Sequence, residues 1–139
     1  MENQTALLSV STLVKAPIEK IWDYWTGPEH IMQWNNPSTE WKTTSVENDV
    51  RSGGKFSFVM ETANGGGFTF AGTYDEVILH EKLSYVLSDG RRTIDLFSIT
   101  PEGVTITELF DPEKGTPEAD QQAFCAGVLE HFRRYAENH

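Results

Sequence analysis

The sequence predicts an α+β fold, in which one antiparallel sheet carries a single long helix over its apolar face. Three observations support this prediction. Helical and strand-like periodicities occupy separate parts of the chain, most of the strand-like runs follow one another between residues 40 and 110, and the last 20 or so residues return to helical spacing. The 139 residues contain no Pro/Gly/Ser-rich linker and no internal repeat, so we expect residues 1–139 to form one domain.

The N-terminal part predicts one strand followed by two short helices. Apolar residues alternate over residues 6–15 and predict the strand, which Ala16 and Pro17 end. The next segment has one apolar stripe at positions i, i+3, i+4 and i+7, which indicates a helix: Ile18, Ile21, Trp22 and Trp25. A second helix is expected from Pro28, with Trp34 near its end.

The central part predicts a meander of strands. Six alternating runs are bounded by Gly, Pro, Asp or Asn: 40–48, 53–62, 67–79, 82–88, 92–100 and 103–110. Their clean alternation indicates an antiparallel sheet with one buried face and one face in water. Leu96 and Phe97 are adjacent, so only one of them belongs to the interior. Arg91 and Arg92 follow Asp89-Gly90, a type I′ turn signal, and we interpret them as a solvated hairpin tip.

The C-terminal part predicts one long helix over residues 117–137. Pro117 is suited to its first turn, and a wide apolar stripe runs along it from Phe124 through Val128 to Phe132 and Tyr135. This stripe is expected to lie over the apolar face of the sheet.

The charge balance excludes some classes of partner. The chain has 21 acidic and 11 basic residues, for a net charge of −10, so phosphate backbones and anionic lipid surfaces would repel it. We therefore expect neither nucleic-acid nor membrane binding. The sequence has no apolar run of membrane-spanning length and no secretory signal pattern, which predicts a cytoplasmic protein. We expect a monomer or a weak homodimer.

The residue inventory also argues against metals and cofactors. Cys125 is the single cysteine, and the four histidines are far apart in the sequence: His30, His80, His131 and His139. No nucleotide-binding glycine motif or nucleophile elbow is present. We expect no metal and no cofactor.

Several stretches carry a family resemblance when they are taken in order. They are residues 14–22, 34–35, 47–56, 72–77, 83–85, 107–113 and 128–137, of which 47–56 (ENDVRSGGKF) is the most distinctive. With the element order, they make the chain similar to the START-like, or SRPBCC, superfamily with its helix-grip fold. The branch it resembles is homologous to the C-terminal domain of the activator of heat-shock-protein-90 ATPase. The chain departs from that branch at Ala123-Phe124, where the family often has Gly-Trp.

The resemblance implies a curved antiparallel sheet wrapped around the long C-terminal helix, with two short helices after the first strand and a cavity between sheet and helix. Members of the superfamily use such cavities for apolar or aromatic molecules. The expected cavity residues here are Trp34, Trp41, Phe58, Met60, Phe70, Tyr74, Tyr85, Glu108, Phe124, Val128 and His131.

Two interpretations of this aromatic-rich face remain open. If the long helix stands off the sheet, the side chains line a ligand cavity, whereas if it packs tightly they fill a core. Trp34 and Trp41 flank residues 35–40, which either cover the mouth of the cavity or are pinned to the core by the two indoles.

Glu108 is the most informative single residue. It alternates with Val104, Ile106 and Phe110 on a face that should be buried, where a carboxylate must be paired, protonated or in contact with a wet cavity. The alternative is a strand that twists outward and exposes it. With His131 across a cavity, Glu108 would form an acid–base pair, and these two are the only catalytic candidates.

Three functions follow, in order of preference. The first is a cofactor-free protein that binds a small hydrophobic or aromatic ligand in an internal cavity. The second is a chaperone-associated stress-response module that acts as the heat-shock ATPase activator does. The third is a cyclase- or hydrolase-type enzyme that uses Glu108 and His131, and a binding role is favoured over it because no nucleophile constellation is present.

Overall fold

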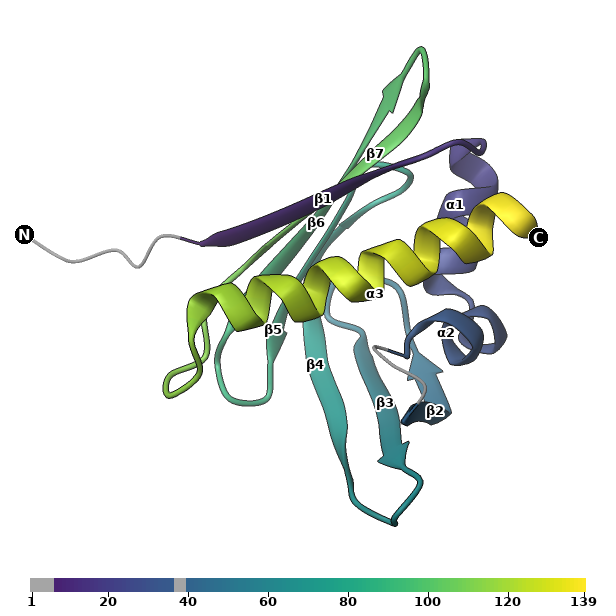
Figure 1. The fold of residues 1–139 in the computed structure, drawn as a ribbon. Coiled ribbons are helices and arrows are strands. Elements are labelled where there is room, and N and C mark those ends of the chain that lie inside the picture. Colours follow the sequence, from purple (N-terminus) through teal and green to yellow (C-terminus); the bar gives the residue numbers. More distant parts are fainter. Residues whose placement is uncertain (1–6, 37–39) are drawn as a thin grey trace, which may run out of the picture.

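A seven-stranded sheet curls around one long helix in the computed structural model, which describes residues 7–36 and 40–139 (Figure 1). The elements follow in the order β1 (Leu8–Val14), α1 (Ile18–Thr26), α2 (Pro28–Trp34), β2 (Trp41–Asn48), β3 (Lys55–Thr62), β4 (Gly67–Ile78), β5 (Lys82–Leu87), β6 (Arg92–Thr100), β7 (Gly103–Phe110) and α3 (Glu118–Asn138). The α+β helix-grip prediction is confirmed, and each expected element lies within about two residues of its predicted bounds. Within the described ranges, no helix is both long and apolar enough to cross a membrane.

The sheet is a meander closed by the first strand. Its strand order is β1-β7-β6-β5-β4-β3-β2, and every neighbouring pair is antiparallel. Strand β1 joins the far edge by pairing along its whole length with β7, from Leu8 opposite Phe110 to Val14 opposite Val104. The helices α1 and α2 therefore fill the connection between the two edge strands, β1 and β2.

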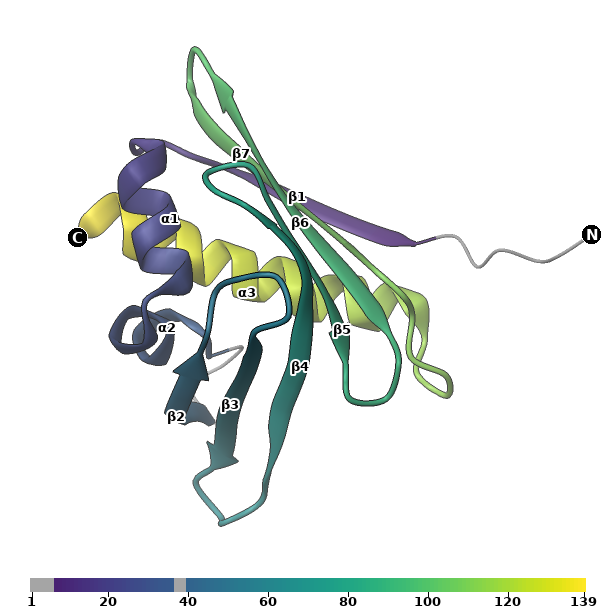
Figure 2. The same cartoon turned by 180° about the vertical axis from the view of Figure 1, so that it is seen from behind.

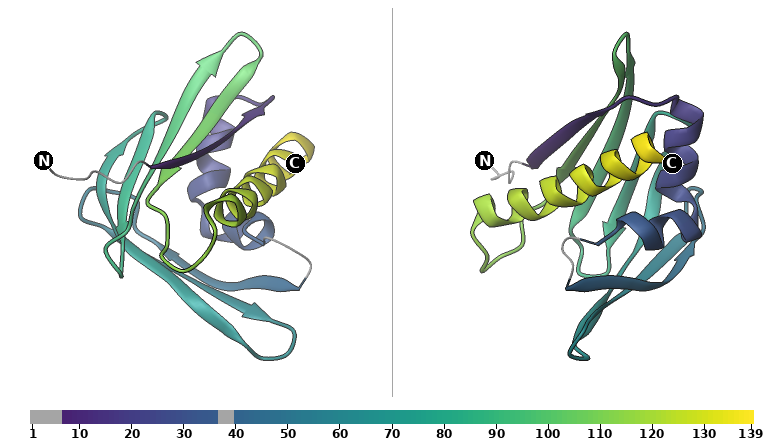
Figure 3. Two further views of the ribbon diagram at one scale, coloured as in Figure 1. Left: turned by 60° about the vertical axis from the view of Figure 1, so that its left-hand side comes forward. Right: turned by 45° about the vertical axis from the view of Figure 1, so that its right-hand side comes forward.

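Two irregularities help the sheet to curl. The register shifts between Thr43 and Ser45 in β2 and between Tyr74 and Glu76 in β4. Such bulges bend a strand and increase its twist. As a result the sheet wraps one side of α3, as the view in the left panel of Figure 3 shows.

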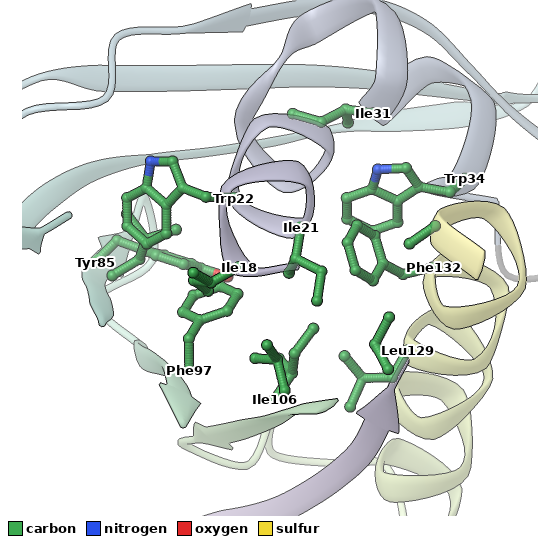
Figure 4. Close-up of a cluster of buried hydrophobic side chains, with 14 of the residues drawn as sticks. Ile18, Ile21, Trp22, Ile31, Trp34, Tyr85, Phe97, Ile106, Leu129 and Phe132 are labelled. Carbon is green, nitrogen blue, oxygen red and sulfur yellow. The ribbon is translucent and has the colours of Figure 1, made fainter. Parts of the chain in front are cut away.

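The apolar core lies at one end of the molecule. The buried residues of α3 are Leu129, Phe132 and Ala136, all in its C-terminal half. Seen from behind, α1 and α2 lie beside this end of α3 (Figure 2). Figure 4 shows Phe132 and Leu129 pointing from α3 toward side chains of α1, α2 and β7, including Ile21, Trp34 and Ile106. The inward face of this end of the helix is tightly packed, whereas Arg134 and Asn138 on its other face are exposed.

The N-terminal half of α3 packs differently. From Glu118 to Val128 none of its residues is buried, and Phe124 keeps 47% of its surface exposed. The helix thus rests on the core at one end and stands off the sheet at the other. The two interpretations of the aromatic face therefore apply to different regions of it, because one end is filled and the other is open.

The open question about Leu96 and Phe97 is also answered. Phe97 is buried on the concave face, where it meets Trp22 and Trp25 edge-on, whereas Leu96 is exposed on the outer face. This choice fixes which other residues of β6 point inward, because residues two apart on a strand share a face.

The unequal packing of α3 predicts unequal costs for two truncations on the same helix. We expect Phe132→Ala to lower the free energy of unfolding by about 3–5 kcal/mol, because it empties a fully buried site between Trp25 and Trp34. Phe124→Ala, which removes the same atoms from a half-exposed site, should cost less than about 1 kcal/mol. Urea denaturation of both variants measures the difference, and equal costs would contradict the two-ended packing.

Candidate functional site: an aromatic cavity with a carboxyl pair

A cavity of about 550 Å³ lies between the concave face of the sheet and the N-terminal half of α3. Strands β3 to β7 form its walls, α3 covers it, and α1 and α2 close one end through Trp25 and Trp34. Its lining includes Phe56, Phe58, Met60, Phe68, Phe70, Tyr74, Leu83, Tyr85, Leu87, Asp95, Glu108, Phe110, Phe124, Cys125 and Val128. The surface is thus mainly aromatic and aliphatic, with a few polar groups among the rings.

The aromatic wall is organised around Phe56. Its ring lies 4.9–5.7 Å, between centroids, from the rings of Phe58, Phe70, Tyr74 and Tyr85. These edge-on and tilted contacts are the arrangements that aromatic rings prefer. The Phe56 ring lies directly over Gly72, where an added Cβ would be 2.8 Å from its Cζ atom. Because Gly72 has no side chain, the Phe56 ring can pack directly against the backbone of β4.

Two half-exposed phenylalanines mark the rim. Phe68 on β4 and Phe124 on α3 both line the cavity, and each keeps 47% of its surface exposed. Trp41 meets Phe68 edge-on at 5.4 Å between centroids, yet it is not among the lining residues. The prediction that Trp41 lines the cavity is therefore wrong, because its indole packs against the rim residue Phe68 instead. Part of the segment predicted to cover the mouth, residues 37–39, lies outside the described residues.

Trp34 has both of the roles that were considered for it. It is buried, it stacks on Trp25 at 4.9 Å, and its Nε1 donates a 2.9 Å hydrogen bond to the Tyr24 carbonyl. The same indole lines one end of the cavity. Trp34 therefore joins the packed core to the open region, and its fluorescence should respond to what occupies the cavity.

A pair of carboxyl groups lies on the floor of the cavity. Glu108 on β7 and Asp95 on β6 are directly opposite each other in the antiparallel register, so both point to the concave face. Asp95 is 1% exposed, and its Oδ1 atom has no hydrogen-bond partner. Glu108 lines the cavity rather than twisting out to solvent, which decides between the two orientations considered for it.

Burial and proximity change the proton affinity of this pair. Removal from water is the largest cause that raises the pKa of both carboxyl groups, and the neighbouring charge of Glu108 raises the pKa of Asp95 further. A hydrogen bond between the two acts in the opposite direction on Glu108 and lowers its pKa. The more deeply buried Asp95 therefore holds its proton more tightly than Glu108 does.

The two tyrosines of the wall are held by polar partners. The Tyr74 hydroxyl donates a 2.6 Å hydrogen bond to Oδ1 of Asn48, and burial is the main reason that its pKa is raised. The pKa of Tyr85 is also raised, first by burial and then by the charges of Asp95 and Glu108. Both phenols consequently stay protonated beside the carboxyl pair.

The structure does not bring His131 to this site. His131 lies on the C-terminal half of α3 and is not among the lining residues, so it does not face Glu108 across the cavity. The partner of Glu108 is Asp95, which the sequence analysis missed. A signal was available, since Asp95 has the same strand parity as Phe97 and would follow it into the interior.

The other polar end of the cavity is formed by the hairpin of Arg91. A type I′ turn needs positive φ at both central residues, but in this turn only Gly90 has it, so the type I′ prediction is wrong. Two backbone hydrogen bonds close the turn: Gly90 N–H donates to the Leu87 carbonyl, and Leu87 N–H donates to the Arg91 carbonyl. Arg91 lines the cavity rather than forming a purely solvated tip. Its guanidinium contacts Asp89 at 2.8 Å and Glu113 at 3.6 Å.

Cys125 brings a thiol to the same cavity as the carboxyl pair. It lines the cavity from α3, and burial together with the charges of Glu108 and Asp95 raises its pKa to about 12. A thiol with this pKa is almost entirely protonated at neutral pH and is a poor nucleophile. In the described part of the chain, no three His, Cys, Asp or Glu side chains are grouped so that they could hold a metal ion.

Comparison with known proteins identifies relatives of the chain. The family model described as Activator of Hsp90 ATPase homolog 1-like protein matches residues 15–134. The AHSA1-like protein from Aeromonas hydrophila, solved by NMR, is 36% identical, with a TM-score of 0.90 over 95% of this chain and 92% of that one. A protein from Cytophaga hutchinsonii is 38% identical, with a TM-score of 0.84 over 95% and 92% of the two chains.

More distant structures share the fold alone. A protein from Nitrosomonas europaea has a TM-score of 0.82 at 17% identity, over 99% of this chain and 97% of that one. No curated protein matches the sequence.

The carboxyl pair predicts how stability depends on pH. The folded pKa of Glu108 lies above its unfolded value, so the folded state binds more protons and the free energy of unfolding falls as pH rises through the interval between the two values. We expect Glu108→Gln to remove this fall. Relative to the unmodified protein, the variant should gain more than about 0.5 kcal/mol at about pH 8 and little at about pH 4.

Denaturation curves at the two pH values measure this effect. Glu102→Gln, which removes one exposed carboxylate from the β6–β7 turn, is the matched control and should show no such gain. A gain for Glu108→Gln that is larger in acid than at neutral pH would contradict the raised pKa.

Proposed function

The chain belongs to the family of Activator of Hsp90 ATPase homolog 1-like proteins, and from its cavity we propose that it binds a small hydrophobic or aromatic molecule. One observation supports this most directly: a volume of about 550 Å³, lined mainly by rings, remains open beside a well-packed core. Ligand sites of proteins typically enclose about 300–1,000 Å³ and are lined by apolar side chains with a few polar groups. This cavity has both properties.

The arrangement of polar groups adds to the argument. The lining rings offer apolar contact over most of the cavity, whereas the carboxyl pair at the floor supplies the few directional contacts that would fix the orientation of a ligand. The exposed phenylalanines at the rim, Phe68 and Phe124, would become buried against an entering molecule. Their burial would contribute to affinity in proportion to the apolar area removed from water.

Binding is better supported than catalysis. Among the described residues that line the cavity there is no histidine and no lysine, and the one thiol, Cys125, is a poor nucleophile. The carboxyl pair offers acid–base groups, but no activated nucleophile lies with it among those lining residues. We therefore propose a binding protein rather than a cyclase or hydrolase.

A variant that fills the cavity tests the proposal. Val128→Phe adds a ring to the cavity side of α3, and we expect it to weaken binding of aromatic probes by about tenfold or more while the protein stays folded. Binding is followed by quenching of tryptophan fluorescence, to which Trp25 and Trp34 contribute from the end of the cavity.

The control places the same kind of change elsewhere. Ile99→Phe puts a ring near the end of β6 at a position that does not line the cavity and is 68% exposed, and it should leave binding unchanged. If the unmodified protein binds nothing from a panel of polycyclic aromatics, sterols and lipids, the proposal fails.

A second candidate function follows from the description of the family. Proteins of this kind are described as homologous to an activator of the Hsp90 ATPase, and the match extends over residues 15–134. If this chain acts in that way, the purified protein should raise the ATP turnover of the host's Hsp90 by about twofold or more, with an excess of serum albumin as the control. If ATP turnover is unchanged and the protein still binds a ligand, the activator function is rejected and ligand binding remains as the proposed function.

A further inference from the structure

We propose that the cavity selects a positively charged ligand: an aromatic or polycyclic molecule with one amine, whose ammonium group binds to Asp95 and Glu108. This inference rests on the proposed function and names the chemistry of its ligand. Three features of the described residues support it, namely the unpaired carboxyl oxygen, the charge balance of the lining and the chemistry of the walls.

The first feature is the unsatisfied acceptor. Oδ1 of Asp95 is buried without a hydrogen-bond partner, which costs free energy unless a donor reaches it. Glu108, directly opposite, is a second acceptor on the same face. An ammonium group carries three N–H donors and no acceptor, so it can serve both carboxyl groups at once.

The second feature is the excess of negative charge. Five acidic side chains line the cavity, Asp95, Glu108, Asp111, Glu113 and Asp120, and one basic side chain, Arg91. Arg91 pairs with Asp89 and Glu113, and Asp111 pairs with Arg92, so among the described lining residues Asp95, Glu108 and Asp120 are the acidic groups without a basic partner. Because such a lining attracts cations and repels anions, a fatty acid or another carboxylate is disfavoured. A neutral ligand would gain no charge–charge attraction from these carboxylates.

The third feature is the aromatic wall. Phe56, Phe70, Tyr74 and Tyr85 line the same cavity as the carboxyl pair, and Tyr74 and Tyr85 are near enough to Asp95 to interact with its charge. The faces of such rings carry partial negative charge, so a cation placed over them is attracted. The same rings bury the apolar part of the molecule, so one surface serves both parts of an aromatic amine.

Three probes with one ring system and different head groups test this inference. They are anthracenylmethylamine, anthracenylmethanol and anthracene carboxylate, whose absorption overlaps the emission of Trp25 and Trp34 and reports binding by energy transfer. We expect the amine to bind at least about tenfold more tightly than the alcohol, and the carboxylate to bind most weakly. In Glu108→Gln the amine should lose this advantage, because the charge and one acceptor are gone.

The matched control is Glu102→Gln, which changes the net charge equally but lies outside the cavity and should keep the preference for the amine. A second readout is the dependence on pH, measured on the unmodified protein. Affinity for the amine should rise as pH rises and Glu108 gives up its proton, whereas affinity for the alcohol should stay constant. The other titratable groups of the lining are Tyr74, Tyr85 and Cys125, whose raised pKa values keep them uncharged around neutral pH, together with Arg91, Asp111, Glu113 and Asp120.

The outcomes separate this inference from the proposal on which it rests. If the alcohol binds as tightly as the amine, or if Glu108→Gln keeps the preference, the assignment of an amine ligand is overturned while ligand binding stands. If none of the three probes binds, both the amine assignment and the proposed binding of aromatic molecules are overturned for ligands of this size.

Discussion

The packing of Phe132 against Trp25 and Trp34 is the contact on which the rest of the structure depends. It joins α3 to α1 and α2 at one end of the sheet, with ring centroids 4.9 Å apart in both contacts. The packed core fixes the C-terminal half of α3. Its N-terminal half touches the edge strand β1, where Gln122 Nε2 donates a 3.4 Å hydrogen bond to the Ser9 carbonyl, and otherwise lies over the cavity. The cavity is thus a consequence of where the helix is fixed, rather than of missing side-chain volume. A sheet bent by bulges in β2 and β4 adds the curvature that keeps its walls apart.

Such an arrangement separates the residues that stabilise the fold from those that shape the site. The core around Ile21, Ile106 and Leu129 buries its apolar surface almost completely. At the other end, the protein accepts half-exposed rings and a buried carboxyl pair, both of which lower stability. Costs of this kind are typical of functional sites, because a ligand can recover them on binding. The carboxyl pair is the largest of them, since Asp95 is removed from water with one oxygen unpaired.

Much of the fold could be predicted from sequence because its signals are local. Alternation in the strands and the stripe from Phe124 to Tyr135 in the helix depend only on periodicity, and the expected bounds agree with the structure within about two residues. The carboxyl pair could not be found in this way. Glu108 stood out because it interrupts an apolar face, whereas recognition of Asp95 required the choice between Leu96 and Phe97 and the register of β6 on β7. The places of Trp41 and His131 depend on how far α3 and the rim stand from the sheet, and no periodicity encodes that distance.

Within this family, the acidic residues of the cavity say more about the ligand than the fold does. Proteins at 17% identity have the same architecture, so the architecture alone does not specify a ligand. What distinguishes one cavity from another is the set of polar groups among the rings. Here that set is acidic, and Asp95 and Glu108 have no basic partner among the described residues, whereas Glu113 and Asp111 are paired with Arg91 and Arg92. A potential of that sign inside an aromatic cavity favours cations among the apolar molecules that fit.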